Sequence, residues 1–120
     1  LVPEVGNLPV VGWAMWARFH DVLGKGCRLW LSPPPFDHSK VLVVDGSWTS
    51  VGSGNWDPRS LRLNFEFNME CYDERLAQEL EQLVDQRIGR ARRLTEGELA
   101  ERSVWLQLRD GMARLFEPYL

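Results

Sequence analysis

The 120-residue sequence is poor in the residues that disulfide scaffolds, metal clusters and membrane spans require. It holds two cysteines, Cys27 and Cys71, without CxxC spacing. We therefore expect buried free thiols in a reducing compartment rather than a disulfide or metal ligands. No run approaches about 18 consecutive apolar residues, which excludes a membrane-spanning helix within this sequence.

The sequence also lacks an excess of positive charge. It has 14 basic and 17 acidic residues and a net charge of −3. Residues 1–72 carry 6 basic and 7 acidic groups, and residues 73–120 carry the remaining 8 basic and 10 acidic groups. Since neither part is basic, we expect no nucleic-acid partner held by a broad electrostatic surface. A local pocket for one phosphate remains compatible with this balance.

Apolar residues make up 44% of the sequence, enough for one domain with a core. Helical spacing of apolar residues predicts a helix over 10–23, with Pro9 in its first turn. Residues 27–31 alternate and predict a short strand. The three prolines at 33–35 then predict an extended loop.

A hairpin is predicted next, from strands at 38–45 and 48–51 joined at Asp45-Gly46. Residues 64–72 alternate again and predict a further strand. Its apolar face holds Phe65, Phe67, Met69 and Cys71, and its polar face holds Asn64, Glu66, Asn68 and Glu70.

Two amphipathic helices are predicted towards the C-terminus. The first spans 73–94, and a capping box at Thr95 and Glu98 follows it, with Leu94 and Leu99 as a hydrophobic staple. One face of the last helix, which ends at Pro118, holds Trp105, Leu108, Met112, Leu115 and Phe116. We expect both helices to cover the sheet; a partner or a bilayer surface is the alternative for the last one. The alternation favours an α/β (α+β) fold with a mixed sheet flanked by helices.

His38 and Lys40 are the main candidates for chemistry. Residues two apart on a strand share a face, so an imidazole and an ammonium lie side by side and suit an anion. His38 is suited to attack phosphorus or to move a proton. The hairpin returns Gly52-Ser53-Gly54-Asn55 to the same place, where Ser53 and Asn55 supply neutral donors for phosphate oxygens. Glu66 is a candidate to orient the His38 ring.

These residues form the pattern His-x-Lys-x4-Asp-x6-Gly-Ser-x-Asn without a gap, at His38, Lys40, Asp45, Gly52, Ser53 and Asn55. The pattern resembles the signature of the phospholipase D superfamily. Six fixed positions at ~5% usage each match by chance about once in 10⁸ windows. The flank from Asn55 to Glu66 and the closing residues 115–120 are similar to bacterial cardiolipin synthases.

The resemblance implies two-step phosphodiester transfer through a phosphohistidine. Carried over, His38 is either the nucleophile or the general acid/base, and Lys40, Ser53 and Asn55 bind phosphate. Glu66 matches the carboxylate that orients the histidine. Asp45 belongs to the motif, although its place at a turn suggests a structural role. The resemblance implies no metal and no cofactor.

The family needs two copies of the motif, and this sequence has one. We therefore expect residues 1–120 to be the C-terminal phospholipase D-like catalytic domain of a longer two-motif protein, inactive by itself. The implied partners are a phosphatidylglycerol-like phospholipid, the N-terminal half with the other motif, and a membrane surface. The parent would work at the cytoplasmic face of a bacterial inner membrane, and the fragment itself would be soluble. An apolar docking surface left uncovered would favour self-association of the fragment.

Two alternatives remain open. The chain would build its site from two identical copies if it were a single-motif phosphodiesterase or nuclease. It would have no activity if it were a degenerate half-domain that binds phospholipid headgroups or only packs on its partner. Two residues depart from the family pattern, Asp37 before the motif histidine and Trp56 after the motif. A carboxylate at position 37 would raise the pKa of the imidazole and repel phosphate.

Overall fold

The computed structural model describes residues 1–6, 8–35, 37–55 and 64–116. The chain divides into two units, one formed by Leu1–Phe36 with Arg90–Leu120 and the other by Asp37–Gly89. Each unit contains one three-stranded sheet, so the expected α/β class is confirmed, with two sheets where the sequence suggested one.

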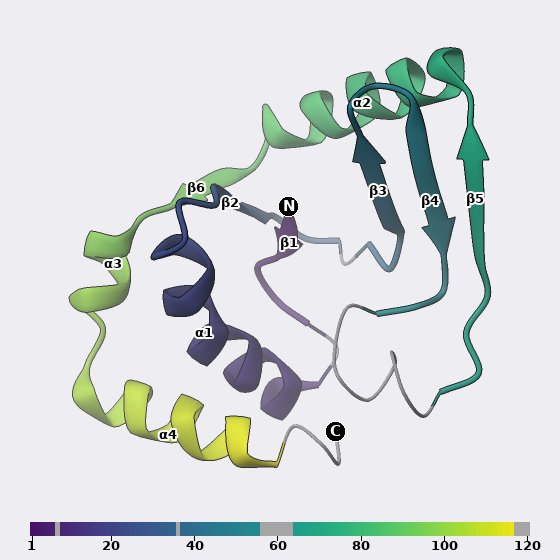
Figure 1. Ribbon diagram of the computed structural model, residues 1–120. Coiled ribbons are helices and arrows are strands. Elements are labelled where there is room, and N and C mark those ends of the chain that lie inside the picture. Colours follow the sequence, from purple (N-terminus) through teal and green to yellow (C-terminus); the bar gives the residue numbers. More distant parts are fainter. Residues whose placement is uncertain (7, 36, 56–63, 117–120) are drawn as a thin grey trace. The chain divides into compact units, whose positions relative to one another are not determined.

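The described part of the first unit contains the following strands and helices (Figure 1): β1 (Val2–Pro3), α1 (Pro9–Leu23), β2 (Leu29–Ser32), β6 (Arg92–Leu94), α3 (Glu96–Ala100) and α4 (Val104–Leu115). Its sheet has the order β1-β2-β6, with β1 parallel and β6 antiparallel to β2. The core forms where α1 and α3 meet this sheet, and consists of Phe19, Leu23, Leu29, Leu31, Leu94 and Leu99.

The residues predicted to begin helices α1 and α3 are found at the starts of those helices. Pro9 occupies the first turn of α1. Thr95 and Glu98 form the predicted capping box of α3, in which the Thr95 backbone N–H donates to Glu98 Oε2 at 3.0 Å. Both staple residues, Leu94 and Leu99, are buried in the core.

The prediction of one helix over 73–94 is wrong at its C-terminal end. The helix α2 covers Glu74–Ile88 and ends at the cap residue Gly89. Residues Arg92–Leu94 form β6 and pair with β2, where Leu94 lies opposite Leu29. Leu94 continues the apolar spacing of α2, but a strand lets it join the core while Arg92 and Arg93 stay exposed.

The second unit is an antiparallel sheet with α2 beside it. Its strands are β3 (Lys40–Val44), β4 (Trp48–Gly52) and β5 (Asn68–Tyr72), in the order β3-β4-β5. The predicted turn at Asp45-Gly46 is confirmed, since both residues have positive φ, 51° and 60°. Asp73 caps α2 by accepting a hydrogen bond from the Leu76 N–H.

The strand predicted over 64–72 is shorter in the structure. β5 begins at Asn68, which pairs with the last residue of β4, Gly52. Phe65 and Phe67 therefore lie before the strand, and both are exposed instead of facing a core. Of the predicted apolar face, Met69 is also exposed and Cys71 is half-buried. β4 ends at Gly52 and offers no further strand partner for Phe65 and Phe67.

The two cysteines are free, but the expectation that both are buried is wrong. Cys71 is half-buried in β5, and Cys27 is exposed. Cys27 belongs to the turn after α1, where its N–H donates to the Val22 carbonyl, and β2 begins two residues later.

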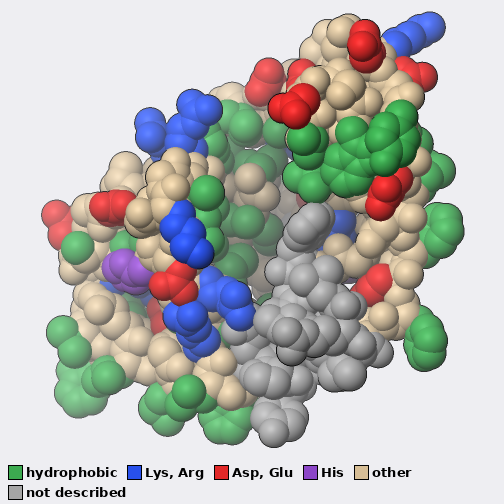
Figure 2. Space-filling model, in the orientation of Figure 1, with side chains coloured by type: hydrophobic (Ala, Val, Ile, Leu, Met, Phe, Trp, Pro, Cys, Tyr) green, Lys and Arg blue, Asp and Glu red, His purple; other side chains and the backbone are tan. Residues whose placement is uncertain are grey.

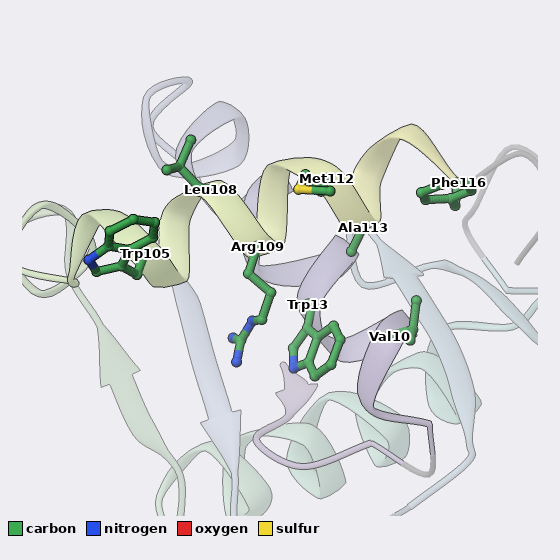
Figure 3. Close-up of a pocket in the computed structure, with 8 residues that line it drawn as sticks. All are labelled: Val10, Trp13, Trp105, Leu108, Arg109, Met112, Ala113 and Phe116. Carbon is green, nitrogen blue, oxygen red and sulfur yellow. The ribbon is translucent and has the colours of Figure 1, made fainter.

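Helix α4 does not cover a sheet with its apolar face. It packs against α1 and buries Asp110 and Ala113, while the predicted apolar face stays on the surface, with Trp105 80% exposed. Hydrophobic side chains are visible along α4 in Figure 2. An open groove of about 540 Å³ lies between α1 and α4, lined by Val10, Trp13, Trp105, Leu108, Arg109, Met112, Ala113 and Phe116 (Figure 3). Among the described residues, no helix has the length and apolarity to cross a bilayer.

Candidate active site

Strand register brings the motif residues together in the second unit. Lys40 at the start of β3 lies opposite Gly52 at the end of β4, and Gly52 lies opposite Asn68 at the start of β5. His38 comes two residues before Lys40, and Ser53 comes directly after Gly52. One end of the sheet therefore collects residues that are up to 30 positions apart in the sequence.

The imidazole of His38 contacts the ammonium of Lys40. Lys40 Nζ lies 2.7 Å from Nδ1 and 2.8 Å from Nε2 of His38, and it donates to the His38 carbonyl oxygen at 2.7 Å. His38 is exposed and Lys40 is half-buried. A potential nucleophile and a fixed cation are thus adjacent, which is the pairing that phosphoryl chemistry needs.

The environment of Lys40 weakens its hold on a proton. Burial lowers the pKa of the Lys40 ammonium from its usual value, and the negative charges of Glu66 and Asp37 oppose this shift. A cation that has lost part of its hydration gains more from an anionic ligand than a fully hydrated one. An anionic group beside Lys40 Nζ would therefore be favoured.

Ser53 and Glu66 contact each other at the same end of the sheet. The Ser53 hydroxyl donates to Glu66 Oε2 at 2.6 Å and accepts a hydrogen bond from the Phe67 N–H at 3.1 Å. The Ser53 N–H donates to the Phe67 carbonyl at 2.9 Å. Sequence reasoning expected Glu66 to orient His38, and the structure places its carboxylate on Ser53. The orienting role stays a prediction.

Gly52 and Gly54 allow the strands to approach closely. A Cβ at Gly52 would clash with the Phe67 carbonyl and the Asn68 side chain, and would lie 2.7 Å from Asn68 Cα. A Cβ at Gly54 would lie 2.8 Å from Asn68 Nδ2. Position 52 requires glycine because a side chain there would push the backbone of β5 away from Ser53, whereas a side chain at position 54 would displace only the Asn68 amide.

We expect Gly52→Ala to displace the loop that carries Ser53 and to lower activity of the full-length protein by about tenfold or more, with about 1–3 kcal/mol of destabilisation. Gly111→Ala is the matched control, because a Cβ there meets nothing within 4 Å. Activity and urea unfolding of both variants measure the effect. Equal behaviour of the two variants would contradict the close-approach argument.

Asp45 is not part of this cluster. It sits in the turn at the other end of β3, five residues from Lys40, which is roughly 16 Å along a strand. Its positive φ points to the turn as its local role. Asn55 is exposed and comes two residues after Ser53 in the sequence. The flank that carried part of the resemblance, residues 56–63, and Pro118 lie outside the described residues.

Two residues near the site were not identified from the sequence. Asn68 Oδ1 accepts the Gly54 N–H at 3.2 Å, which fixes the loop after β4. The alternation of residues 64–72 placed Asn68 on the same face as Glu66, and this pattern could have identified Asn68 as a residue near the site. Arg87, in the last turn of α2, pairs with Asp37, and nothing in the local sequence indicated this contact.

No group of three or more potential metal-ligating side chains occurs in the part of the chain that the structure describes. The charged and polar groups that do converge are an imidazole, an ammonium, a hydroxyl and a carboxylate. This set, on an antiparallel sheet beside a helix, is the set of groups that the resemblance to the phospholipase D superfamily implies.

Comparison with known proteins agrees with this class. The family model "Cardiolipin synthase, PLD-like domain" matches residues 1–88, so the chain belongs to this family. Over its full 120 residues, the chain is 34% identical to cardiolipin synthase 1 of Staphylococcus epidermidis and 34% identical to cardiolipin synthase of Staphylococcus aureus. The chain spans 24% of the length of each of these relatives. No solved structure matches the chain.

Proposed function

We propose that this chain is the C-terminal catalytic domain of a cardiolipin synthase-like phosphatidyltransferase and supplies one of its two half-sites. The observation that carries the proposal is the contact between the His38 ring and Lys40 Nζ, with Ser53 and Glu66 at the same end of the sheet. Family membership and the relatives' names support a phospholipid substrate. Because the sequence has one copy of the motif and the relatives are about four times as long, the second half-site would come from elsewhere in the full-length protein.

In the proposed reaction, one motif imidazole attacks the phosphorus of phosphatidylglycerol. The bond from phosphorus to the headgroup oxygen breaks, and the other motif histidine gives that oxygen a proton, which releases glycerol. The same histidine then takes a proton from the hydroxyl of a second phosphatidylglycerol. That oxygen attacks the phosphohistidine, which yields cardiolipin and restores the first imidazole. His38 would take one of these two roles.

The remaining residues of the cluster would hold the transferring phosphoryl group. Lys40 would bind a non-bridging oxygen as a point charge, and Ser53 and Asn55 would donate hydrogen bonds to it. Ser53 donates its single hydroxyl hydrogen to Glu66 in the structure. On lipid binding this hydroxyl would turn to the phosphate oxygen, and the released Glu66 carboxylate would position the histidine ring. Fixed cations and donors would supply the charge stabilisation that this transfer requires. Both substrates are lipids, so the site would work at a membrane surface, at the cytoplasmic face of the inner membrane.

The test uses the full-length protein and vesicles of phosphatidylglycerol with labelled headgroup glycerol. We expect one labelled glycerol released for each cardiolipin formed. Release of glycerol with phosphatidic acid and no cardiolipin would show a hydrolase instead. No release from a folded protein would contradict the proposal.

A further inference from the structure

The carboxylate of Asp37, next to the motif histidine, is engaged on both of its oxygens. Its Oδ1 accepts the Ser39 N–H at 2.8 Å, across His38. Its Oδ2 pairs with the guanidinium of Arg87 from the last turn of α2. The side chains of Arg87 and Asp37 are 40% and 39% exposed, so the pair is partly shielded from water.

Without a partner, this carboxylate would work against the proposed reaction. A negative charge one residue from His38 repels an anionic phosphodiester and stabilises the protonated imidazole. Asp37 is ionised at neutral pH, because hydrogen bonds from Ser39, with a smaller contribution from Arg87, hold its pKa below the usual range. The negative charge of Asp37 is therefore not removed by protonation, and a nearby cation has to offset it.

Arg87 is suited to that task. A guanidinium keeps its charge at every physiological pH and forms a directional pair with a carboxylate. In the described part of the chain, the other charged groups at this end of the sheet are Lys40 on β3, which contacts His38, and Glu66 before β5, which accepts a hydrogen bond from Ser53. Among the described residues, Arg87 is the charged group that α2 brings to Asp37.

We propose that Asp37 and Arg87 form a positioning pair for the motif histidine: Asp37 holds the backbone around His38, and Arg87 cancels the negative charge that would otherwise face the phosphodiester. This inference rests on the proposed function. Neither residue touches the reacting atoms in this scheme. Both act through the placement and the charge state of His38.

The first test is kinetic and uses the full-length protein. We expect Arg87→Gln to raise KM for phosphatidylglycerol by about threefold to tenfold, because the charge of Asp37 is then uncompensated. The limb of the pH profile that belongs to His38 should move to higher pH by about half a unit, whether His38 acts as nucleophile, base or acid. Asp37→Asn combined with Arg87→Gln should restore both values, because the amide oxygen can still accept the Ser39 N–H.

Arg75→Gln is the matched control. Arg75 lies on the same helix and forms an exposed pair with Glu79 at 3.3 Å, so this variant should keep the wild-type KM and pH profile. If the double variant were no better than Arg87→Gln alone, or if Arg87→Gln matched Arg75→Gln, the pair would have no positioning role. Melting temperatures of all variants identify any loss that comes from unfolding.

A second measurement does not depend on catalysis. The rate at which diethyl pyrocarbonate modifies His38, followed by mass spectrometry across pH, reports the protonation of that ring in the same full-length variants. The midpoint should rise in Arg87→Gln and return in the double variant. A midpoint that does not change would overturn the inference even if the protein transfers lipid. A shifted midpoint in a protein without transfer activity would instead reject the proposed function but support the positioning role of Asp37 and Arg87.

Discussion

His38→Ala in the full-length protein should reduce the rate of cardiolipin formation on the order of 10⁴-fold or more. Alanine can neither form the phosphohistidine nor move the proton, and the remaining histidine cannot perform both halves of the reaction. The rate of headgroup release from phosphatidylglycerol vesicles measures this loss.

The chain provides its own control for this variant. His20 is its other histidine, and it lies exposed in the last turn of α1, in the other unit. His20→Ala should therefore keep wild-type turnover. If His38→Ala retained turnover, or if both histidine variants lost it equally, the assignment of His38 would be wrong.

Asp110→Ala should lower the free energy of unfolding by about 3–5 kcal/mol, because it leaves partly buried guanidinium groups without their counter-charge. The Asp110 side chain is 5% exposed and pairs with Arg102 at 2.6 Å and with Arg109 at 2.8 Å. The same two guanidinium groups lie over Trp16 and Trp13 of α1, at 4.1 and 4.5 Å from the ring centroids. Removal of Asp110 therefore loosens the contact between α1 and α4.

The matched control is Asp21→Ala. Asp21 also pairs with an arginine, Arg114 at 2.9 Å, but both side chains are about half exposed. Its loss should cost less than about 1 kcal/mol. Urea unfolding measures both variants, and hydrogen exchange of the α1 and α4 amides locates the effect. Equal costs for Asp110 and Asp21 would contradict the importance of burial.

Much of the local structure could be predicted because it depends on neighbours in the chain. Proline at the start of α1, the Asp45-Gly46 turn and the Thr95–Glu98 capping box are determined by contacts within four residues. Apolar spacing identified α1 and α4, although it could not tell which surface each would cover. The same spacing failed at Leu94, where burial in another core outweighed helical continuity.

The candidate site was predictable in its residues but not in its contacts. The gapless pattern from His38 to Asn55 identified the imidazole, the ammonium and the hydroxyl, because the hairpin that unites them lies within the pattern. It did not indicate that Glu66 would contact Ser53, or that Arg87 would reach Asp37. Those contacts join segments separated by variable loops or by a helix, and no local preference determines them.

The amino-acid sequence alone determined the family, the catalytic candidates and the turns that hold them, since each depends on residue type at short spacing. Tertiary structure decided the rest: the contact of Arg87 with Asp37, the pairing of β6 with β2, and the exposed apolar face of α4. The physical reason is that burial and charge pairing depend on which distant segments pack together. That packing is a property of the whole fold and cannot be assigned to any one stretch of chain.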